Sequence, residues 1–395
     1  MKKSNTSKYY KLMEYLRDEM LTGRIMPGDK IPSENMLAEK FSLSRHTVRK
    51  SIAILANEGL LYTEHGRGTF SSGVLRKSRD SKNIGVITTY ISEYIFPQVI
   101  SGIDEVLSQS GYSIILKNTG NDHLKEVVCL KDILDKDIAG LIVEPTRSAL
   151  YTQNIKYYET LDSYGIPYVF IHGCYDQLSG KPCVLVDDSG GMFKLVSYLV
   201  KTSHRNICGI FKADDVQGLN RHKGYVKALS ESGLNYDPEK VIWFHTEDRD
   251  TKPFAALKSM IDNGAKIDAV TCYNDEIAFE IVKLLTDAGI KVPQDISVTG
   301  FDDSYLAESC PVKLTTVRHP KKELGSEAAS IVLQMISEGA GGIGTGSMGT
   351  GGTEVIGDSS HIRTTSPMVK VFKPEIILRD STSDKNQNLN FKDFK

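Results

Sequence analysis

Residues 27–70 read PGDKIPSENMLAEKFSLSRHTVRKSIAILANEGLLYTEHGRGTF, and this stretch decides the fold of the N-terminal part of the chain. Ser33 and Ser44 each precede a short segment with apolar residues at helical spacing, and serine is a favoured helix cap. The glycines of EHGRG allow a tight turn between two short apolar runs. The stretch therefore predicts a helix-turn-helix followed by a strand–turn–strand wing.

Three helices are expected to build the core of this head. Residues 8–22 place apolar side chains at i, i+3 and i+4, which predicts a first helix with one buried face. The second helix is expected to bury Met36, Leu37 and Phe41, and the third Val48, Ile52 and Leu55. The opposite side of the third helix then carries long hydrogen-bond donors near its start, as a helix that reads the major groove requires.

The charge is distributed unevenly along the chain. Residues 1–79 hold 15 Lys and Arg against 8 Asp and Glu, a net charge of +7, whereas the whole chain carries −2. A basic head on an acidic body favours a polyanionic partner for the head, although charge alone is equally compatible with a solvated, lysine-rich face.

The head resembles the winged helix-turn-helix of the GntR family, with the Pro-Ser-Glu before the second helix, the S-R-x-T-V-R run and the G-x-G-T-F wing at family spacing. The resemblance implies double-stranded operator DNA as partner, with contacts from four parts of the head. These are Arg45, His46, Thr47 and Arg49 on the third helix, Ser33 and Glu34 at the start of the second, His65, Gly66 and Arg67 in the wing, and Lys8 and Tyr9 on the first helix. The alternative is a helical domain that binds protein.

From residue 84 onward, short apolar β-branched runs alternate with amphipathic helical segments, as in NIGVITTY, IAGLIVEP, IPYVFIHG and NICGIFK. This alternation predicts parallel sheets covered by helices on both faces. The number of such runs favours two α/β lobes. We predict a DNA-binding domain at 1–72, a polar linker at 73–83 and an α/β domain at 84–395.

Residues 339–366 are rich in glycine and are predicted to form a flexible surface insertion. They contain a formal G-x-G-x-x-G at Gly344, Gly346 and Gly349. That motif binds dinucleotides only between a strand and a helix, and here it follows a helix and leads into more glycine. No cofactor is expected.

Polar side chains follow four of the predicted strands: Glu144, His172, Asn274 and Asp302. Ligands of open α/β sheets bind beyond the carboxyl ends of the strands. A sugar hydroxyl both donates and accepts hydrogen bonds, so paired polar groups of this kind suit a monosaccharide. For any single residue, a purely structural role is the alternative.

The body resembles the LacI and periplasmic sugar-binding architecture, through IGVITTYISEYIFPQVISGIDEVLSQSGYSIILKNTGND, VDDSGGMFKLVSYLV and VTGFDDSYLAESCPVKLTTVRHP among other blocks. This resemblance implies a two-lobed effector domain like the periplasmic binding proteins, which forms a homodimer and binds sugar between its lobes. It adds Arg221, Tyr94, Phe96 and His319 to the ligand-binding residues, and more weakly Thr89.

Blocks such as TTYISEYIFPQ, NDHLKE and GIFKADDVQG resemble the arabinose repressors of Gram-positive bacteria in particular. That resemblance implies L-arabinose as inducer and the operators of arabinose uptake and catabolism genes as targets. The residues themselves are equally compatible with another pentose or a hexose, and they do not separate a repressor from an activator.

Other classes of protein find little support in the sequence. It lacks G-x-x-x-x-G-K-[ST], G-x-S-x-G and H-E-x-x-H, so an enzyme is not expected. A transporter's sugar-binding protein would be exported, yet the N-terminus has no apolar signal segment and no apolar run is long enough for a membrane span, so a cytoplasmic location is expected. The six scattered cysteines predict reduced thiols without a metal site or disulfide.

Overall fold

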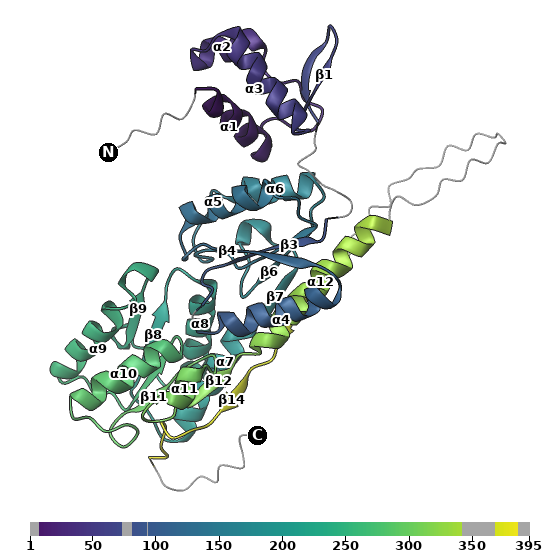
Figure 1. The fold of residues 1–395 in the computed structure, drawn as a ribbon. Helices are drawn as coiled ribbons and strands as arrows, with labels where there is room; N and C mark the ends of the chain where they lie inside the picture. Colours follow the sequence, from purple (N-terminus) through teal and green to yellow (C-terminus); the bar gives the residue numbers. More distant parts are fainter. Residues whose placement is uncertain (1–7, 73–80, 93, 342–367, 386–395) are drawn as a thin grey trace, which may run out of the picture.

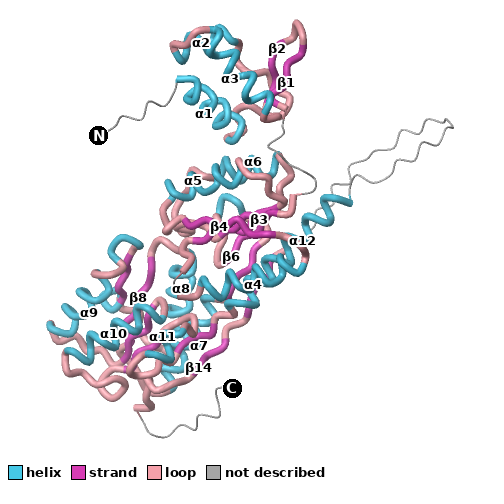
Figure 2. The backbone as a smooth tube through the Cα atoms, in the orientation of Figure 1, coloured by secondary structure: helices cyan, strands magenta, loops and turns pink. Residues whose placement is uncertain are grey.

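The computed structural model describes residues 8–72, 81–92, 94–341 and 368–385. A small head is followed by a two-lobed body, in which the N-terminal lobe lies next to the head and the C-terminal lobe beyond it (Figures 1 and 2). Most of the predicted linker and of the predicted glycine-rich insertion lie outside the described residues.

The head is the predicted winged helix-turn-helix. It consists of α1 (Lys8–Leu21), α2 (Glu34–Phe41), α3 (Arg45–Asn57), and the antiparallel pair β1 (Leu61–Glu64) and β2 (Gly68–Ser71). The Ser33 side chain accepts a hydrogen bond from the Met36 N–H, and Ser44 accepts one from the Thr47 N–H, so both predicted caps are confirmed.

The prediction that Met36 belongs to the core of the head is wrong. Val48, Ile52 and Leu55 are buried as expected, but the Met36 side chain is 61% exposed. Leu37 and Phe41 are four residues apart and therefore share the inward face of α2. Met36 precedes Leu37 by one position, about 100° around the helix, and so points toward solvent.

The N-terminal lobe is built on a six-stranded parallel sheet in the order β13-β7-β6-β5-β3-β4. The strands are β3 (Asn83–Thr88), β4 (Ser113–Asn118), β5 (Gly140–Val143), β6 (Tyr168–Ile171), β7 (Cys183–Val186) and β13 (Val369–Phe372). One face packs against α5 (His123–Leu134) and α6 (Ile155–Ser163), the other against α4 (Phe96–Gln109) and α12 (Lys321–Gly341). Helices therefore cover both faces of the sheet and exclude water from them. This explains why the central strands are apolar throughout.

The C-terminal lobe has a four-stranded parallel sheet in the order β11-β10-β8-β9. Its strands are β8 (Ile207–Lys212), β9 (Val241–Phe244), β10 (Ala269–Cys272) and β11 (Ser297–Thr299). Its helices are α7 (Asp188–Lys201), α8 (Val216–Glu231), α9 (Lys252–Asp262), α10 (Asp275–Asp287) and the short α11 (Tyr305–Ser309). The first two pack on one face of the sheet, and α9 and α10 on the other.

Within the described residues the chain passes between the lobes three times. It leaves the N-terminal lobe from β7 to α7, returns from β12 (Thr316–Arg318) to α12, and leaves again from β13 to β14 (Glu375–Ile377). Strands β12 and β14 pair antiparallel with each other at this crossing. Within the described residues, these three connections form the hinge between the lobes.

The prediction that the cysteines are reduced thiols is wrong for one pair. Cys174 and Cys183 form a disulfide, because Cys174 lies shortly after β6 and Cys183 begins the neighbouring strand β7. The other four cysteines are buried and free. Among the described helices, none is both long and apolar enough to cross a membrane.

Candidate functional site

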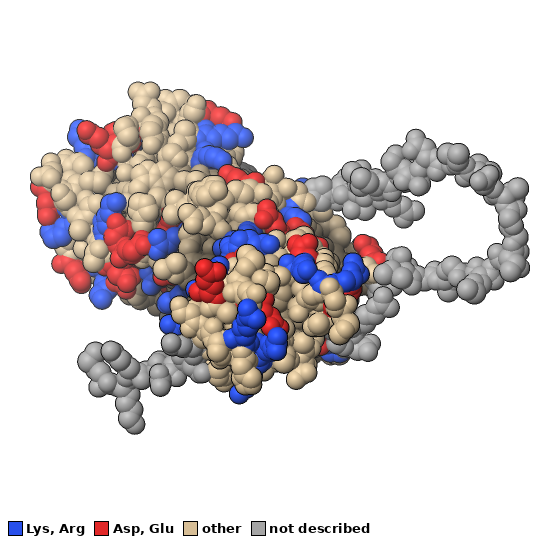
Figure 3. Space-filling view, turned by 90° about the horizontal axis from the view of Figure 1, so that it is seen from above, with Lys and Arg blue, Asp and Glu red and all other residues tan. Residues whose placement is uncertain are grey.

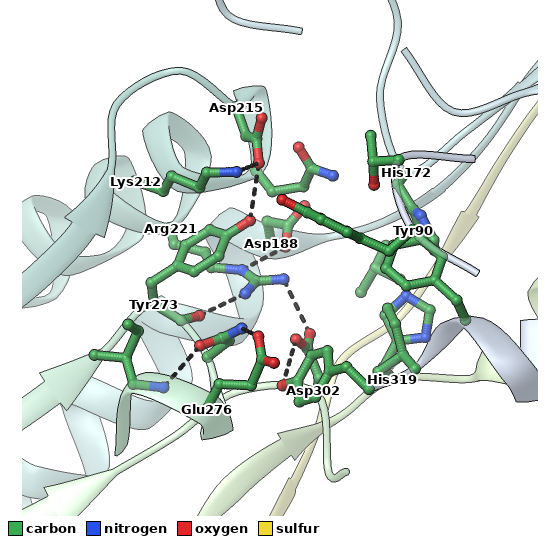
Figure 4. Close-up of a pocket in the computed structure, with 18 of the residues that line it drawn as sticks. Tyr90, His172, Asp188, Lys212, Asp215, Arg221, Tyr273, Glu276, Asp302 and His319 are labelled. Atoms are coloured by element: carbon green, nitrogen blue, oxygen red, sulfur yellow. Dashed lines mark hydrogen bonds and ion pairs between the residues drawn. The ribbon is translucent and has the colours of Figure 1, made fainter. Parts of the chain in front are cut away.

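A cleft between the two lobes has a cavity volume of about 90 Å³ (Figure 4). The structure brings all nine sequence-predicted ligand residues to its wall: Thr89, Tyr94, Phe96, Glu144, His172, Arg221, Asn274, Asp302 and His319. Strand ends from both sheets supply most of them, as the topology of parallel sheets requires.

On the N-terminal side, Glu144 organises its neighbours. One carboxylate oxygen accepts the Thr89 N–H at 2.7 Å and the Thr89 hydroxyl at 2.5 Å. The other lies 3.0 Å from His172 Nδ1. Because an ionised carboxylate only accepts, the hydrogen of a neutral His172 is placed on Nδ1, and Nε2 is left as an acceptor.

Two histidine nitrogens at the cleft have no hydrogen-bond partner among the described residues. They are His172 Nε2 and His319 Nδ1, both buried. The two rings lie edge to face with centroids 5.0 Å apart (Figure 4). Burial lowers the pKa of His319, with His172 adding to the effect, so this imidazole is neutral at pH 7. Unpaired buried polar atoms are costly, so these nitrogens suit a ligand with hydroxyl groups.

On the C-terminal side, Arg221 is held from three directions. Its Nε donates to Asp188 at 2.8 Å, Nη1 donates to the Tyr273 carbonyl at 2.5 Å, and Nη2 donates to Asp302 at 3.1 Å. The guanidinium also lies 3.7 Å from the centre of the Phe301 ring. The planar cation is thus fixed between two carboxylates and an aromatic face.

Burial shifts the ionisation of this network. Burial lowers the pKa of Arg221, but Asp302 and Asp188 outweigh that effect and the net shift is upward. Burial raises the pKa of Asp188 to about 6 against the attraction of Arg221. Near neutral pH the cleft therefore presents a permanent cation at Arg221.

Asn274 has a local role as well as a place on the wall. Its Oδ1 accepts the Ile277 N–H at 3.0 Å and caps α10, while its Nδ2 donates to Glu276 at 3.1 Å.

Phe96 is the first residue of α4. Its ring lies edge to face with the ring of His172, with 6.1 Å between the centroids.

Tyr94 connects the lobes. It precedes α4 in the N-terminal lobe, and its hydroxyl lies 2.8 Å from both the Phe301 carbonyl and the Asp302 carboxylate of the other lobe. The same oxygen accepts the Asp275 N–H at 3.1 Å. Groups of the C-terminal lobe therefore use the full hydrogen-bonding capacity of the Tyr94 hydroxyl.

Three cleft residues have a positive φ, a backbone conformation that residues other than glycine rarely adopt. Tyr94 has φ +59°, His172 has φ +64° and Asp302 has φ +97°. Such conformations cost free energy and tend to occur at functional sites.

The sequence reasoning missed several cleft residues, among them Tyr90, Asp188, Lys212, Asp215, Arg249, Tyr273 and Glu276. Lys212 ends β8 and donates to Asp215 at 2.6 Å. Burial lowers the pKa of Lys212, but the neighbouring Asp215 and Asp214 raise it by more. The net shift is upward, so the ammonium group stays charged. The strand-end rule applied to GIFKADD would have found both residues.

Seven of the eleven predicted DNA-binding residues lie on α3 and in the wing. Arg45, His46, Arg49, His65 and Arg67 are exposed. The surface that points away from the body carries Lys and Arg side chains with some acidic residues among them (Figure 3).

Several of these head residues are held by neighbours. Glu34 accepts from Arg49 Nε at 2.8 Å, Thr47 and Ser44 hydroxyls are 2.8 Å apart, and Arg67 pairs with Glu64. Gly66, at φ +75°, forms the wing turn and Ser33 is exposed. Tyr9 is half-buried against the head core, and the Lys8 side chain lies outside the described residues.

Two family models match the chain. Residues 8–70 match the gntR family of bacterial regulatory proteins, and residues 196–360 match a periplasmic binding protein-like domain. Among solved structures, the chain resembles the transcriptional regulator CelR in complex with cellobiose, with TM-score 0.62, 20% identity, and coverage of 89% of this chain and 100% of that one. It also resembles CcpA of Lactococcus lactis, with TM-score 0.62, 22% identity, and coverage of 77% and 100%. These likenesses support the fold.

Two curated relatives align over most of the chain. The arabinose metabolism transcriptional repressor of Geobacillus stearothermophilus is 38% identical over 387 residues, which cover 97% of this chain and 100% of the relative. Its counterpart in Halalkalibacterium halodurans is 39% identical, with 84% and 90% covered. The protein therefore belongs to the family of arabinose metabolism transcriptional repressors.

Proposed function

We propose that this protein binds operator DNA as a homodimer through its winged helix-turn-helix and releases it when L-arabinose fills the cleft between the lobes. The regulated genes are those of arabinose uptake and catabolism, and the protein acts in the cytoplasm, where its DNA lies. The alignment at 38% identity over both head and body, with a relative named for arabinose metabolism, is the observation that carries the choice of sugar.

The chemistry of the cleft supports a neutral polyhydroxylated ligand. Its wall offers acceptors at Glu144 and His172 and donors at Arg221 and Lys212, which are the two kinds of partner that a sugar hydroxyl needs. Aromatic rings at Tyr90 and Phe96 provide apolar faces for the C–H groups of the ring.

Release of DNA follows from linkage. A sugar shifts the equilibrium between DNA-binding and non-binding forms only by its difference in affinity for the two. The sugar-binding groups come from both lobes, so closing the cleft completes the site, and the closed form is the one that sugar stabilises. In a dimer, closure changes the spacing and orientation of the two heads relative to paired half-sites.

Titrating the purified full-length protein with monosaccharides tests the proposal. Calorimetry with L-arabinose, D-ribose, D-xylose, D-galactose and D-glucose is expected to give clear binding for L-arabinose. Fluorescence anisotropy with promoter fragments from the arabinose genes is expected to show tight binding that L-arabinose weakens. Sedimentation is expected to give a dimer.

Each part can fail separately. Binding of a different sugar with release of DNA would retain the mechanism and reject the inducer. Sugar that strengthens DNA binding would point to an activator. Promoter occupancy that no monosaccharide changes would reject the coupling altogether.

A further inference from the structure

The head makes a direct contact with the N-terminal lobe that belongs neither to the cleft nor to the DNA surface. We propose that the end of α1 and the α5–α6 face form a docking interface, which the head occupies when the sugar-filled cleft is closed and leaves when it binds the operator. This inference rests on the proposed function, since it explains how sugar binding reaches the head.

The contact combines apolar, hydrogen-bonding and charged parts. Leu21, the last residue of α1, is 8% exposed and packs in the apolar cluster of the lobe that includes Tyr157 and Leu161 of α6. The Leu21 carbonyl accepts a hydrogen bond from the Thr160 hydroxyl at 2.6 Å. Asp18 forms an ion pair with Lys131 of α5.

The Leu21 carbonyl is a suitable anchor. The last carbonyls of a helix have no partner within the helix and must find one elsewhere. Here the body supplies a partner through Thr160, whose hydroxyl also lies 2.8 Å from the Lys156 carbonyl. Asp18 also binds Arg24 of the head at 3.3 Å, so the carboxylate joins a head cation and a body cation.

The docked head keeps its DNA-binding elements free. Figures 1 and 2 place α1 on the side of the head that faces α5 and α6, while α2 and the wing point away from the body. The interface therefore does not block DNA. It fixes the direction in which each head presents α3, and a dimer with fixed heads fits only half-sites of matching geometry.

Buried polar contacts connect this interface with the rim of the cleft. Glu126 of α5 is fully buried and accepts from Tyr158 of α6 at 2.8 Å and from Tyr175 at 2.7 Å. The Tyr175 hydroxyl in turn accepts the Thr146 N–H at 2.9 Å. The Tyr175 hydroxyl thus links the carboxylate of Glu126 on α5 to the loop at Thr146.

The loop at the rim reaches the C-terminal lobe. The Arg147 N–H donates to Asn121 Oδ1 at 2.8 Å, and Asn121 Nδ2 donates to the Thr246 hydroxyl at 2.8 Å. Arg147 also forms an ion pair with Glu247. Opening of the cleft breaks these contacts between lobes, so the docking face is connected to groups whose partners depend on closure.

A charge reversal at the interface provides the test in the full-length protein. Lys131→Glu places a carboxylate against Asp18 and should weaken docking. Lys125→Glu is the matched control, because it makes the same change in the first turn of α5, beside Asp122. Asp18→Lys combined with Lys131→Glu restores an opposite-charge pair.

The measured quantity is the ratio of operator Kd with and without saturating L-arabinose. Lys131→Glu should reduce this ratio by about five-fold or more, the size of a typical coupling energy. Operator affinity without sugar should match wild type, the Lys125→Glu control should respond fully, and the double variant should recover the response. A full response in Lys131→Glu, or loss of operator binding in the absence of sugar, would overturn the proposal.

Hydrogen exchange separates this outcome from failure of the proposed function. Wild-type protein that ignores L-arabinose would reject the inducer. The interface would then be judged by amide exchange at the end of α1 and in α6, which should be faster in Lys131→Glu than in wild type and in Lys125→Glu. Equal exchange in all three proteins would overturn the docking interface itself.

Discussion

The hydroxyl of Tyr94 lies 2.8 Å from the carboxylate of Asp302, so a side chain of the N-terminal lobe ends inside the polar network of the C-terminal lobe. Asp302 also accepts from Arg221, which makes one carboxylate the meeting point of lobe contact and ligand wall. Closure of the lobes and orientation of Arg221 therefore depend on the same group.

Replacing Tyr94 by Phe removes the hydroxyl and keeps the ring. The closed form loses hydrogen bonds to Asp302 and the Phe301 carbonyl, and the open form loses none of them. We expect affinity for L-arabinose to fall about 5- to 30-fold, equivalent to about 1–2 kcal/mol. Operator affinity without sugar should not change.

Calorimetry and anisotropy measure the two quantities for Tyr94→Phe. Tyr236→Phe is the control, since Tyr236 is an exposed tyrosine of the C-terminal lobe. Unchanged sugar affinity in Tyr94→Phe would mean that the contact between lobes does not contribute to closure.

Glu144→Gln should change the hydrogen position on His172. The amide oxygen can serve both donors of Thr89, which leaves the amide NH₂ facing His172 Nδ1. The imidazole then carries its hydrogen on Nε2, so the nitrogen without a protein partner becomes a donor. We expect sugar affinity to fall about ten-fold or more because a fixed acceptor has been lost.

Nitrogen-15 chemical shifts of the histidines at pH 8 distinguish the two tautomers. Glu144→Asp is the comparison, because it keeps an acceptor-only group while shortening its reach. A His172 spectrum that is the same in Glu144→Gln and wild type would contradict this account of the cleft.

Arg45→Ala should weaken operator binding without affecting the sugar site. Arg45 is exposed in the first turn of α3, and loss of one base or phosphate contact costs about 1–3 kcal/mol, or roughly 5- to 150-fold in Kd. Lys227→Ala, on the exposed face of α8, is the charge-matched control. Loss of sugar binding in Arg45→Ala would show that the two domains have been assigned wrongly.

Asp275 should make the stability of the body depend on pH. Burial raises its pKa to about 7, so the folded state binds a proton more tightly than the unfolded state, where the ordinary value is 3.8. The stabilisation is complete below about pH 4 and is lost as the pH rises through about 7, with an upper limit of about 4 kcal/mol.

Urea unfolding of wild type and Asp275→Asn at pH 5, 6, 7 and 8 measures this effect. The wild type should lose free energy of unfolding relative to the variant as the pH rises, since the amide that replaces the carboxyl group does not titrate. A difference between the two proteins that is constant with pH would rule out the proposed ionisation.

The sequence was sufficient for those parts of the fold that local patterns determine. Caps at Ser33 and Ser44 and the apolar strands of both sheets are local signals, and the structure confirms them. Strands β7 and β13 were not among the apolar runs that the sequence analysis identified, although they are as long as the recognised strands β5 and β6.

The site was predictable where a strand end marks it. Glu144 and His172 follow strands that the pattern identified. Asp188 follows the unrecognised β7, so the same rule could not reach it. The saturation of the Tyr94 hydroxyl, and the disulfide between Cys174 and Cys183, depend on how distant segments meet in space. Local sequence patterns do not predict such contacts between distant segments.

The three crossings between the lobes also decide where foreign sequence can be inserted. Both α12, which ends at Gly341, and β13, which begins at Val369, belong to the N-terminal lobe. A fluorescent reporter placed between them leaves and re-enters the same rigid body, and so it would add no strain to the hinge. Paired with a second fluorophore on the opposite lobe, it would turn this protein into a genetically encoded optical gauge of intracellular pentose.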